Sequence, residues 1–514
     1  MKVKETFERG EPLSETFIKE VEEVVGEKNV LRSEAHLIGY SLDYWMFGVF
    51  LSKDGVLPSL PEIVVSPADT AEVQKVLELA NRYGVTVTPF GGGSGVLGGA
   101  IPLKGSIILN LQRMNRFISL DEFSLTGEAE AGIIGANLER ELNYRGYSMG
   151  NIPQSLFCST LGGWVSTRAA GQFSTGYGKI EDMILGLEAV LPTGGIVNIK
   201  PQPRRSVGPS LMNLFLGGEG AFGIVTKAYF SVHPLPEYTA KQSFAFSSMG
   251  EALNAVRQVL RRGAIPACVR IFDTAETARY FGAPKESGTL KTLGKLLRRE
   301  VITSVVQIAS LSKAKEKIDN AELLKDKVSV IFISEGNRKI TQVYESLISE
   351  ICEGLNGIPL GEKPVDIWLN ERFDVTLAPI IMQNGGIVDT IEVVSLFKDC
   401  GSLYRDVVDS MEKVKGAVSV SGHFSHFYRE GACLYVTFAG FPSDKERFYR
   451  EMWDRATEAT LRNNGSISHH HGIGFFRAKY MGEELGDSGL EMLRDLRESI
   501  DPNHILNRGK LTEE

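Results

Sequence analysis

Cysteine is scarce in this chain of 514 residues. The five cysteines are scattered and form no C-x-x-C pair, which favours a reducing compartment such as the cytoplasm and gives no thiolate metal site. They are Cys158, Cys268, Cys352, Cys400 and Cys433. Long apolar runs are also lacking, because no stretch reaches the roughly 18 uninterrupted apolar residues that a membrane-spanning helix needs. We therefore expect a cytoplasmic protein without a membrane span.

An excess of positive charge is missing too. The formal net charge is −8, and the basic cluster Lys295–Arg299 is typical of a solvated helix face, so nothing favours nucleic acid as a partner. The charged segment Met1–Gly10 has no apolar core and is interpreted as neither a signal peptide nor an anchor. Peripheral membrane contact stays open, through an apolar patch in residues 40–57 or 280–320.

The composition is otherwise that of an ordinary globular protein, with 43% hydrophobic residues and enough length for two or three domains. Residues 1–56 predict a helical lead-in. Residues 57–238 alternate short strands, turns and helices, and predict a first domain. Residues 239–465 predict a separate α+β domain built around an antiparallel sheet. Residues 466–514, rich in glycine and histidine at their start, are expected to complete the active site.

A strand, a helix and a second strand precede a dense run of glycines. Residues 61–66 and 85–89 have strand composition, and residues 69–83 place apolar side chains at helical spacing before Gly84. The sequence Pro89-Phe90-Gly91-Gly92-Gly93-Ser94-Gly95 follows at once. Glycines let consecutive N–H groups turn towards one anion and let the backbone approach it closely, as a pyrophosphate requires. We predict a phosphate-binding loop here.

This loop differs from the two commonest phosphate motifs. It lacks G-K-[ST], which excludes a P-loop. Gly93–Gly98 matches G-x-G-x-x-G, but a predicted strand at 106–111 follows, where the dinucleotide fingerprint needs a helix whose N-terminus faces the phosphates. We therefore reject a Rossmann interpretation. Two further turns of small residues, at 152–170 and 217–225, favour a large cofactor held by three backbone cradles in series.

The three segments resemble the FAD-binding domain of the vanillyl-alcohol oxidase and p-cresol methylhydroxylase superfamily. They read P-x-G-G-G-[ST] at Pro89–Ser94, P-x-S-x-x-x-S-T-x-G-G at Pro153–Gly163, and G-x-E-G-x-x-G-[IV] at Gly217–Ile224. The resemblance implies an α+β protein: a two-subdomain FAD-binding fold of the p-cresol methylhydroxylase type plus an α+β substrate domain with an antiparallel sheet.

The same resemblance implies FAD as the cofactor, with Gly91–Gly95 on the pyrophosphate and the second and third segments around the flavin. Some relatives attach the flavin covalently through a loop histidine. No histidine lies between His36 and His233, so we predict non-covalent FAD. The implied cofactor-binding residues are Pro89, Gly91, Gly92, Gly93, Ser94, Gly95, Pro153, Ser155, Ser159, Thr160, Gly162, Gly163, Thr167, Ala170, Glu219, Gly220, Gly223 and Ile224.

Five of the eight histidines fall in two late segments, Gly422–His426 and Ser468–Gly474. Neutral histidine suits proton transfer near pH 7, so the group favours a catalytic role over five separate structural ones. If the second segment is extended, alternate side chains face opposite ways, and His470 points away from His469 and His471.

Between these segments, Gly431–Phe438 alternates like a strand. Leu434, Val436 and Phe438 fall on one face, whereas Tyr435 falls on the other, less apolar face together with Cys433 and Thr437. Tyr435 is therefore expected to point into a pocket or onto a sheet surface rather than into the main core.

These late segments resemble alkyldihydroxyacetonephosphate synthase, on His423-Phe424-Ser425-His426-x-Tyr428, Gly431–Tyr435, Ser466–Gly474 and Asp501–Ile505. In that family, which serves ether-lipid biosynthesis, N5 of the flavin traps the dihydroxyacetone phosphate moiety, an acyl group leaves and a fatty alcohol replaces it. The resemblance implies that Tyr435 is the acid/base, assisted by His469, His470 and His471, with Arg270 near the flavin. It makes Arg372, His423 and His426 candidates for substrate binding, and it implies a homodimer.

One departure leaves the substrate open. Before Asp389-Thr390-Ile391-Glu392 the family carries an Arg-Asp pair whose arginine grips the substrate phosphate, but here Leu377–Met382 contains no cation. A phosphate dianion without that arginine loses its strongest expected partner.

Two alternatives therefore remain beside the synthase. One is an FAD-linked dehydrogenase or oxidase of a D-2-hydroxy acid or related alcohol, and the other is a non-enzymatic flavin-fold binding protein. Some dehydrogenases of this kind bind a metal through a glutamate at the position that His470 occupies here, so we expect no metal.

Overall fold

The computed structural model describes residues 12–281 and 324–512, and it divides into two compact units. Unit 1 comprises residues up to Gly171, Gly178–Leu235 and His470 onwards. Unit 2 comprises Gln172–Tyr177 and Pro236–His469. The predicted boundary at 238/239 thus lies close to the change of unit at Leu235, and most of the predicted closing segment 466–514 belongs to unit 1.

Unit 1 begins with the predicted strand–helix–strand arrangement, which the structure confirms. Strands β2 (Ile63–Val65), β4 (Ile107–Asn110) and β3 (Val87–Phe90) are parallel in the order β2-β4-β3, and β1 (Val30–Leu31) pairs antiparallel with β2. Helix α4 (Thr70–Tyr83) starts at the capping carboxylate of Asp69, which accepts from Glu72 N at 2.9 Å. It ends at Gly84, whose φ of 66° suits glycine.

The helical lead-in is part of this core. Helix α1 (Glu15–Val25) buries Phe17 and Val21 in the same cluster as the apolar face of α4. The C-terminal residues join as well, because Leu506 bridges Val87 in parallel. The remaining helices of unit 1 are α2 (Glu34–Gly39), α3 (Met46–Lys53), α5 (Gly135–Tyr144), α6 (Leu161–Thr167), α8 (Ile180–Met183), α9 (Met212–Phe215), α19 (Met481–Leu485) and α20 (Asp487–Ile500).

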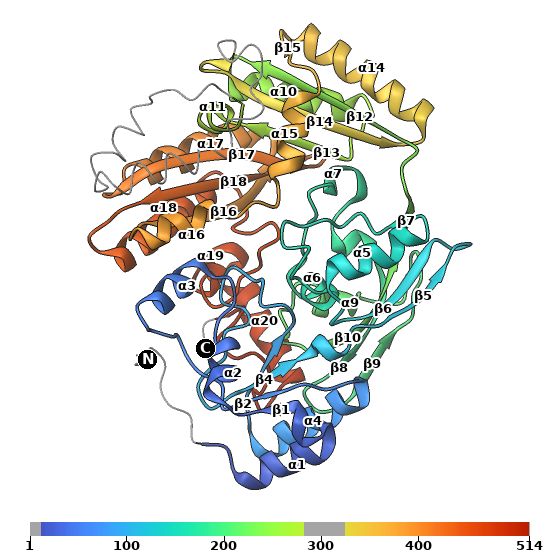
Figure 1. The fold of residues 1–514 in the computed structure, drawn as a ribbon, viewed down its shortest axis with the longest axis vertical. Coiled ribbons are helices and arrows are strands. Elements are labelled where there is room, and N and C mark those ends of the chain that lie inside the picture. Colours follow the sequence, from blue (N-terminus) through green and yellow to red (C-terminus); the bar gives the residue numbers. More distant parts are fainter. Residues whose placement is uncertain (1–11, 282–323, 513–514) are drawn as a thin grey trace. The chain divides into compact units, whose positions relative to one another are not determined.

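A second sheet in unit 1 is antiparallel, with the order β5-β6-β10-β8-β9 (Figure 1). Its strands are β5 (Phe117–Asp121), β6 (Thr126–Glu130), β10 (Ile224–Ser231), β8 (Ile184–Val190) and β9 (Ile196–Ile199). Strands β7 (Tyr147–Ser148) and β11 (His233–Pro234) form a separate two-stranded antiparallel sheet. Two sheets in one unit agree with the two-subdomain fold expected from the sequence.

Unit 2 is built on a seven-stranded antiparallel sheet in the order β15-β12-β14-β13-β17-β18-β16. The strands are β12 (Tyr238–Phe246), β13 (Cys268–Phe272), β14 (Val328–Gly336), β15 (Ile358–Pro359), β16 (Ile387–Leu396), β17 (Ala417–Phe427) and β18 (Gly431–Gly440). The helices are α7 (Ser174–Tyr177), α10 (Met249–Arg261), α11 (Thr274–Tyr280), α14 (Arg338–Gly354), α15 (Lys363–Glu371), α16 (Leu377–Gln383), α17 (Phe397–Glu412) and α18 (Lys445–Arg462).

The two faces of this sheet differ. Phe438 of β18 packs on Phe448 and Tyr449 of α18, as the alternation in the sequence predicted for the apolar face. Gln242 of β12 donates to Ser349 Oγ of α14 at 2.7 Å on that same face. The next residue along β12, Lys241, points to the other face and binds Asp366 of α15 at 2.6 Å. We call this second face the polar face of the sheet.

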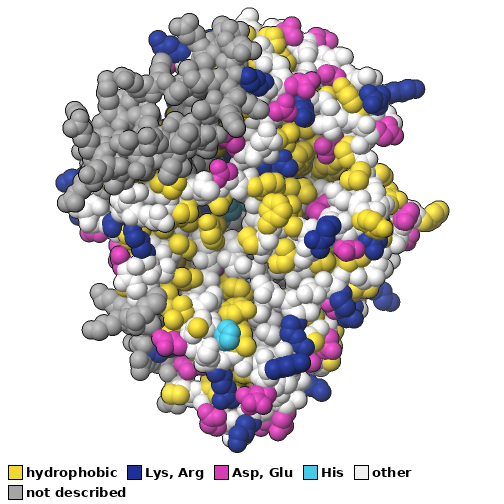
Figure 2. Space-filling view, viewed as in Figure 1, with side chains coloured by type: hydrophobic (Ala, Val, Ile, Leu, Met, Phe, Trp, Pro, Cys, Tyr) yellow, Lys and Arg dark blue, Asp and Glu magenta, His cyan; other side chains and the backbone are white. Residues whose placement is uncertain are grey.

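No helix among the described residues is long and apolar enough to cross a bilayer. In 40–57, Trp45, Phe47 and Phe50 are each 5% exposed or less, whereas Tyr44 is 43% exposed, so peripheral membrane contact through this segment stays a prediction. Most of the other proposed patch, 280–320, and the basic cluster Lys295–Arg299 lie outside the described residues. On the face drawn in Figure 2, Lys and Arg side chains are interspersed with Asp and Glu.

Candidate functional site

The glycine loop of unit 1 lies directly against the second predicted cradle. A Cβ on Gly92 would stand 1.7 Å from the carbonyl oxygen of Cys158, and one on Gly91 would stand 2.3 Å from Thr160 Oγ1. No side chain fits at these positions, so the close approach of the two backbones requires glycine. After the loop the chain continues to β4 without a helix, which confirms that the G-x-G-x-x-G match is not a Rossmann fingerprint.

The third predicted turn reaches the same place. A Cβ on Gly220 would stand 2.4 Å from Pro89, at the start of the glycine loop. Glu219, in a left-handed conformation with φ 47°, turns its carboxylate to the backbone N–H groups of Ile473 at 2.5 Å and Gly474 at 2.8 Å. The side chain that the resemblance assigned to the cofactor pocket therefore holds the C-terminal segment of unit 1. Burial raises the pKa of Glu219, and these two N–H groups oppose that rise.

Several residues of the cradles bind one another. Thr160 caps α6 by accepting from Gly163 N at 3.3 Å, and Ser159 Oγ accepts from Trp164 Nε1 at 2.8 Å. Gly162 packs on the backbone of Ala131, to which its N–H donates at 2.7 Å. These contacts fix the backbone of the second cradle. The direct contacts of the individual predicted residues with FAD stay predictions.

Sequence reasoning missed the side chains that support the loop from afar. Asn507 Nδ2 donates to the carbonyls of Glu219 at 2.6 Å and Gly99 at 3.1 Å, and Lys510 Nζ donates to the carbonyl of Ile101 at 3.0 Å. Their partners are backbone groups some 300 to 400 positions away, for which a sequence carries no signal.

Asp43 also carried no signal in the sequence, because a lone acid in a loop is usually solvated. It is buried beside Gly95 and accepts from the N–H groups of Trp45 at 3.1 Å and Ala100 at 3.3 Å. Burial raises the pKa of Asp43 to about 7, while these two hydrogen bonds and Lys510 oppose the rise. The three cradles of unit 1 thus form one rigid backbone surface, of the kind that holds a dinucleotide pyrophosphate.

In unit 2, the register of the sheet places titratable side chains in a row on the polar face. Glu392 of β16 pairs with Tyr435 of β18, Tyr435 pairs with His423 of β17, and His423 pairs with Phe272 of β13. Paired residues point to the same face. The rings of His423 and Tyr435 stack, with centroids 5.0 Å apart and planes at 11°. Arg270 stands two residues before Phe272 on this face, with its guanidinium 5.1 Å from the Phe272 ring.

Burial keeps His423 neutral, and a buried acid fixes which ring nitrogen carries the proton. Burial lowers the pKa of His423 to about 4, and the positive charge of Arg270 contributes to the decrease, so the ring is neutral at pH 7. Glu276 of α11 lies 3.3 Å from His423 Nδ1 and also pairs with Arg279 at 3.3 Å. Burial alone would raise the pKa of Glu276, but His423 and the arginines hold it at about 2. Because an ionised carboxylate only accepts, Nδ1 carries the proton and Nε2 offers its lone pair.

Tyr435 carries its phenolic proton before the reaction. Its burial, together with the nearby Glu392 and Cys433, raises its pKa far above the usual value, so it is a protonated phenol at neutral pH. It interacts with the hydroxyl of Thr390 on β16, the strand beside it. A proton donor and a neutral acceptor, His423, therefore lie side by side on adjacent strands.

A second cluster surrounds His426. Its φ of 50° lies at a bulge in β17 between Ser425 and Phe427, which redirects its ring. His426 Nδ1 lies 2.6 Å from Ser174 Oγ, and its ring stacks on His469 at 5.0 Å. His469 Nε2 lies in turn 2.8 Å from the hydroxyl of Tyr428.

The histidine run is not extended as the sequence suggested. Residues 469–471 form a bend, and the rings of His470 and His471 lie 4.5 Å apart, edge to face. The prediction that His470 points away from His471 is wrong, because the bend removes the two-residue alternation of a strand. His469 belongs to unit 2, and its N–H donates to Glu392 at 2.6 Å, whereas His470 and His471 belong to unit 1.

Among the described residues of unit 2, one group of side chains could hold a metal ion. One possible ligand atom from each of Glu392, Cys433 and His469 lies within 4.8 Å of the others. Glu392 is fully buried and already accepts from Ser468 Oγ at 3.0 Å as well as from the His469 N–H. The expectation that no metal binds stays a prediction.

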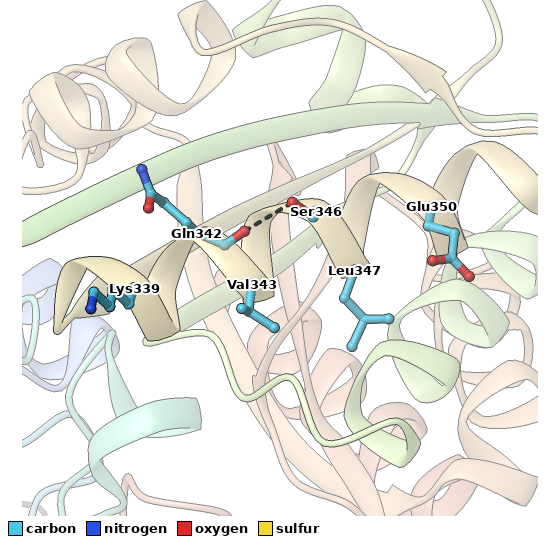
Figure 3. A pocket seen from close by; sticks show the side chains of 6 residues that line it. All are labelled: Lys339, Gln342, Val343, Ser346, Leu347 and Glu350. Atoms are coloured by element: carbon cyan, nitrogen blue, oxygen red, sulfur yellow. Dashed lines mark hydrogen bonds between the residues drawn. The ribbon is translucent and has the colours of Figure 1, made fainter.

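An open pocket on α14 takes no part in this site (Figure 3). It lies along an outer strip of the helix, where Ser346 Oγ donates to the carbonyl of Gln342 at 3.0 Å. Helix α14 covers the face of the sheet opposite to Tyr435, so the pocket and the titratable row are on different sides. Its lining residues are Lys339, Gln342, Val343, Ser346, Leu347 and Glu350.

A backbone cradle for a dinucleotide in one unit and an acid–base row in the other define a flavin-dependent enzyme. Residues 61–200 match the FAD binding domain, and residues 235–511 match the C-terminal domain of FAD linked oxidases. The chain is 30% identical to an alkyldihydroxyacetonephosphate synthase of Trypanosoma brucei brucei, over 97% of this chain and 81% of that one.

Comparison with solved structures gives the same fold. A structure of alkyldihydroxyacetonephosphate synthase superposes with a TM-score of 0.76 at 25% identity, over 99% of this chain and 87% of that one. p-Cresol methylhydroxylase with substrate bound shares the fold, with a TM-score of 0.73 at 16% identity over 97% of this chain and 96% of that one. The chain belongs to the FAD-linked oxidase family and is an FAD-dependent enzyme similar to the alkyldihydroxyacetonephosphate synthases within it.

Proposed function

We propose that this enzyme exchanges the acyl group of an acyl dihydroxyacetone phosphate for a long-chain alcohol. The observation that carries the proposal is the row of Tyr435 and His423 on the polar face, with a protonated phenol stacked on a neutral imidazole. The likeness to alkyldihydroxyacetonephosphate synthases over nearly the whole chain supports it. FAD, when bound, supplies the electron-accepting ring system on which such a substitution depends.

The chain's own residues would manage one proton in each turnover. The incoming alcohol loses its O–H proton as its oxygen bonds to the substrate carbon, and the acyl group leaves as a carboxylate, so one proton must be accepted and released. His423 accepts it at Nε2, because Nδ1 is already protonated against Glu276. Tyr435 donates its phenol proton to the carboxyl oxygen of the departing acyl group and recovers a proton from His423. The proton lost by the alcohol is thus released with the acyl group, which ionises to the carboxylate. His469, held by Glu392 and Tyr428, assists as the sequence suggested.

A second candidate is a dehydrogenase or oxidase of a D-2-hydroxy acid. The match of residues 235–511 to the C-terminal domain of FAD linked oxidases favours it. The same neutral His423 would then take the hydroxyl proton, and FAD, when bound, would supply the hydride acceptor.

One anaerobic experiment separates the two. The holoenzyme is mixed with palmitoyl-dihydroxyacetone phosphate and radiolabelled hexadecanol, and separately with D-lactate or D-2-hydroxyglutarate. We expect labelled alkyl product and free palmitate in equal amounts, with the oxidised flavin band unchanged at the end. Bleaching by a hydroxy acid, with no alkyl product, would reject the exchange reaction and favour the dehydrogenase.

Three finer features belong to the same proposal. We propose that FAD is bound without a covalent link, that two copies associate, and that the enzyme works in the cytoplasm, where it meets lipid substrates at a membrane surface. Acid precipitation should release all the flavin into the supernatant. Light scattering of the holoenzyme gives the number of copies, and flotation with phosphatidylcholine vesicles tests membrane contact.

A further inference from the structure

Two arginines of unit 2 stand against one tryptophan on the polar face. Arg270 comes from β13, and Arg372 follows the last residue of α15. Their guanidinium carbons lie 5.8 Å and 5.9 Å from the ring centre of Trp368, which is 3% exposed. An aromatic face attracts a cation, but it leaves the N–H groups of the guanidinium without acceptors.

Neither arginine has an anionic partner among the described residues. Arg270 makes no hydrogen bond or ion pair there, and its buried Nε has no acceptor. Arg372 also has a buried Nε without an acceptor, and its one hydrogen bond runs from Nη1 to the carbonyl of Leu369 at 3.2 Å. Burial lowers the pKa of Arg372 below that of a free guanidinium. Arg270 and Arg372 are half-buried, and each has a buried Nε without an acceptor on the same face. Buried polar groups of charged side chains are normally paired, so the two guanidiniums indicate an anionic ligand.

The nearest acids are engaged elsewhere. Glu276 binds His423 and Arg279. Glu335 of β14 accepts from the hydroxyl of Tyr177 at 2.6 Å, and burial raises the pKa of its carboxyl group. Glu335 and Glu276 act on Arg372 and Arg270 through longer-range charge interactions, but neither acid forms an ion pair with these arginines.

We propose that Arg270 and Arg372 form an anion subsite that holds the phosphate end of the substrate. This rests on the proposed function. A phosphate has three terminal oxygens and two charges, and can accept from both guanidiniums at once, whereas one fork already satisfies both oxygens of a carboxylate. Arg270 lies two residues along β13 from Phe272, which pairs with His423, so the carbons next to the phosphate would reach the acid–base pair.

The test is a calorimetric titration of the holoenzyme with dihydroxyacetone phosphate and, in parallel, with dihydroxyacetone. We expect the wild type to prefer the phosphorylated ligand by tenfold or more. R372Q should remove about tenfold or more of affinity for that ligand alone, since charge-assisted bonds to phosphate are strong. R372K, which keeps the charge without the fork, should fall between. R338Q is the matched control, because Arg338 stacks on Tyr238 at 4.6 Å in the same unit but is exposed.

The outcomes separate the subsite from the reaction. If R372Q weakens both ligands equally, or lowers the melting temperature as much as the affinity, Arg372 is structural and the subsite is rejected. If alkyl product still forms at the normal KM in R372Q, the exchange reaction stands without the subsite. If D-lactate binds more tightly than dihydroxyacetone phosphate, bleaches the flavin and depends on Arg372, the phosphate assignment is overturned together with the exchange reaction.

Discussion

The two units reach their chemistry in different ways. Unit 1 presents backbone. At Gly91, Gly92 and Gly220 a Cβ would stand only 1.7 to 2.4 Å from a neighbouring atom. Polar side chains such as Asn507 and Glu219 hold that backbone in place. Unit 2 presents side chains, set in a row by strand register and adjusted by buried acids. A backbone site depends on residue type at fixed spacing, so it leaves a motif. A side-chain site depends on which strands are neighbours, so it leaves scattered residues.

The largest expected effect would come from breaking the backbone site. In Gly92→Ala the new methyl would stand 1.7 Å from the Cys158 carbonyl, so the loop must leave the second cradle. Overpacking of this kind commonly costs about 1–3 kcal/mol, and here it also moves the N–H groups meant for the pyrophosphate. We expect purified G92A to lack the flavin absorbance band and to show no activity.

Gly39→Ala is the control for that variant. Gly39 ends α2, and nothing lies within 4 Å of the place that the new methyl group would take, so G39A should keep its flavin. A G92A protein with full flavin content would show that the close approach is not needed for the cofactor.

A smaller, purely chemical effect is expected in unit 2. Tyr435→Phe removes the protonated hydroxyl but keeps the ring that stacks on His423. General acid–base catalysis is typically worth about 10²- to 10⁴-fold, so kcat should fall by that order while the flavin spectrum and melting temperature stay unchanged. Tyr344→Phe on α14, the helix that covers the opposite face, is the control. Unchanged kcat in Y435F would exclude the phenol from the reaction.

The smallest effect is a change in the pH dependence of stability. The folded-state pKa of His423 is lowered to about 4, whereas a histidine in the unfolded chain takes up its proton near pH 6.5. Between these two pH values the unfolded chain therefore binds a proton that the folded chain does not bind. This group therefore makes the protein less stable as the pH falls from about 6.5 to 4. Glu276, with a lowered pKa of about 2, contributes stability that is lost only below its usual range near 4.5. The pH range in which His423 changes the stability therefore hardly overlaps the range in which Glu276 does.

We expect the melting temperature of the His423→Gln variant to fall less than that of the wild type as the pH is lowered from 7 to 4.5. His36→Gln, which changes an exposed histidine beside Ser33, should follow the wild-type curve. Parallel curves for H423Q and the wild type would show that His423 takes up its proton normally in the folded protein.

The comparison explains which parts of the site could be predicted. The strand–helix–strand unit, the glycine loop and the face of Tyr435 followed from local pattern, because spacing within one element fixes them. The histidine run was predicted wrongly in its conformation, since a bend at 469–471 depends on tertiary contacts such as that of the His469 N–H with Glu392. Glu276 and Asp43 carried no signal in the sequence, because a lone acid in a helix or loop is usually solvated.

By itself, the sequence predicted three small-residue cradles in series, since only glycine permits such close backbone approach, and the resemblance of these segments implied FAD. It also determined the residue types available for acid–base chemistry. Only the tertiary structure decided the protonation states and the partners of these side chains. It set His423 neutral and Tyr435 protonated through burial and neighbouring charge, and it left Arg270 and Arg372 beside Trp368 without an acid to pair with. Burial and pairing are properties of the folded chain, because residues hundreds of positions apart create them together.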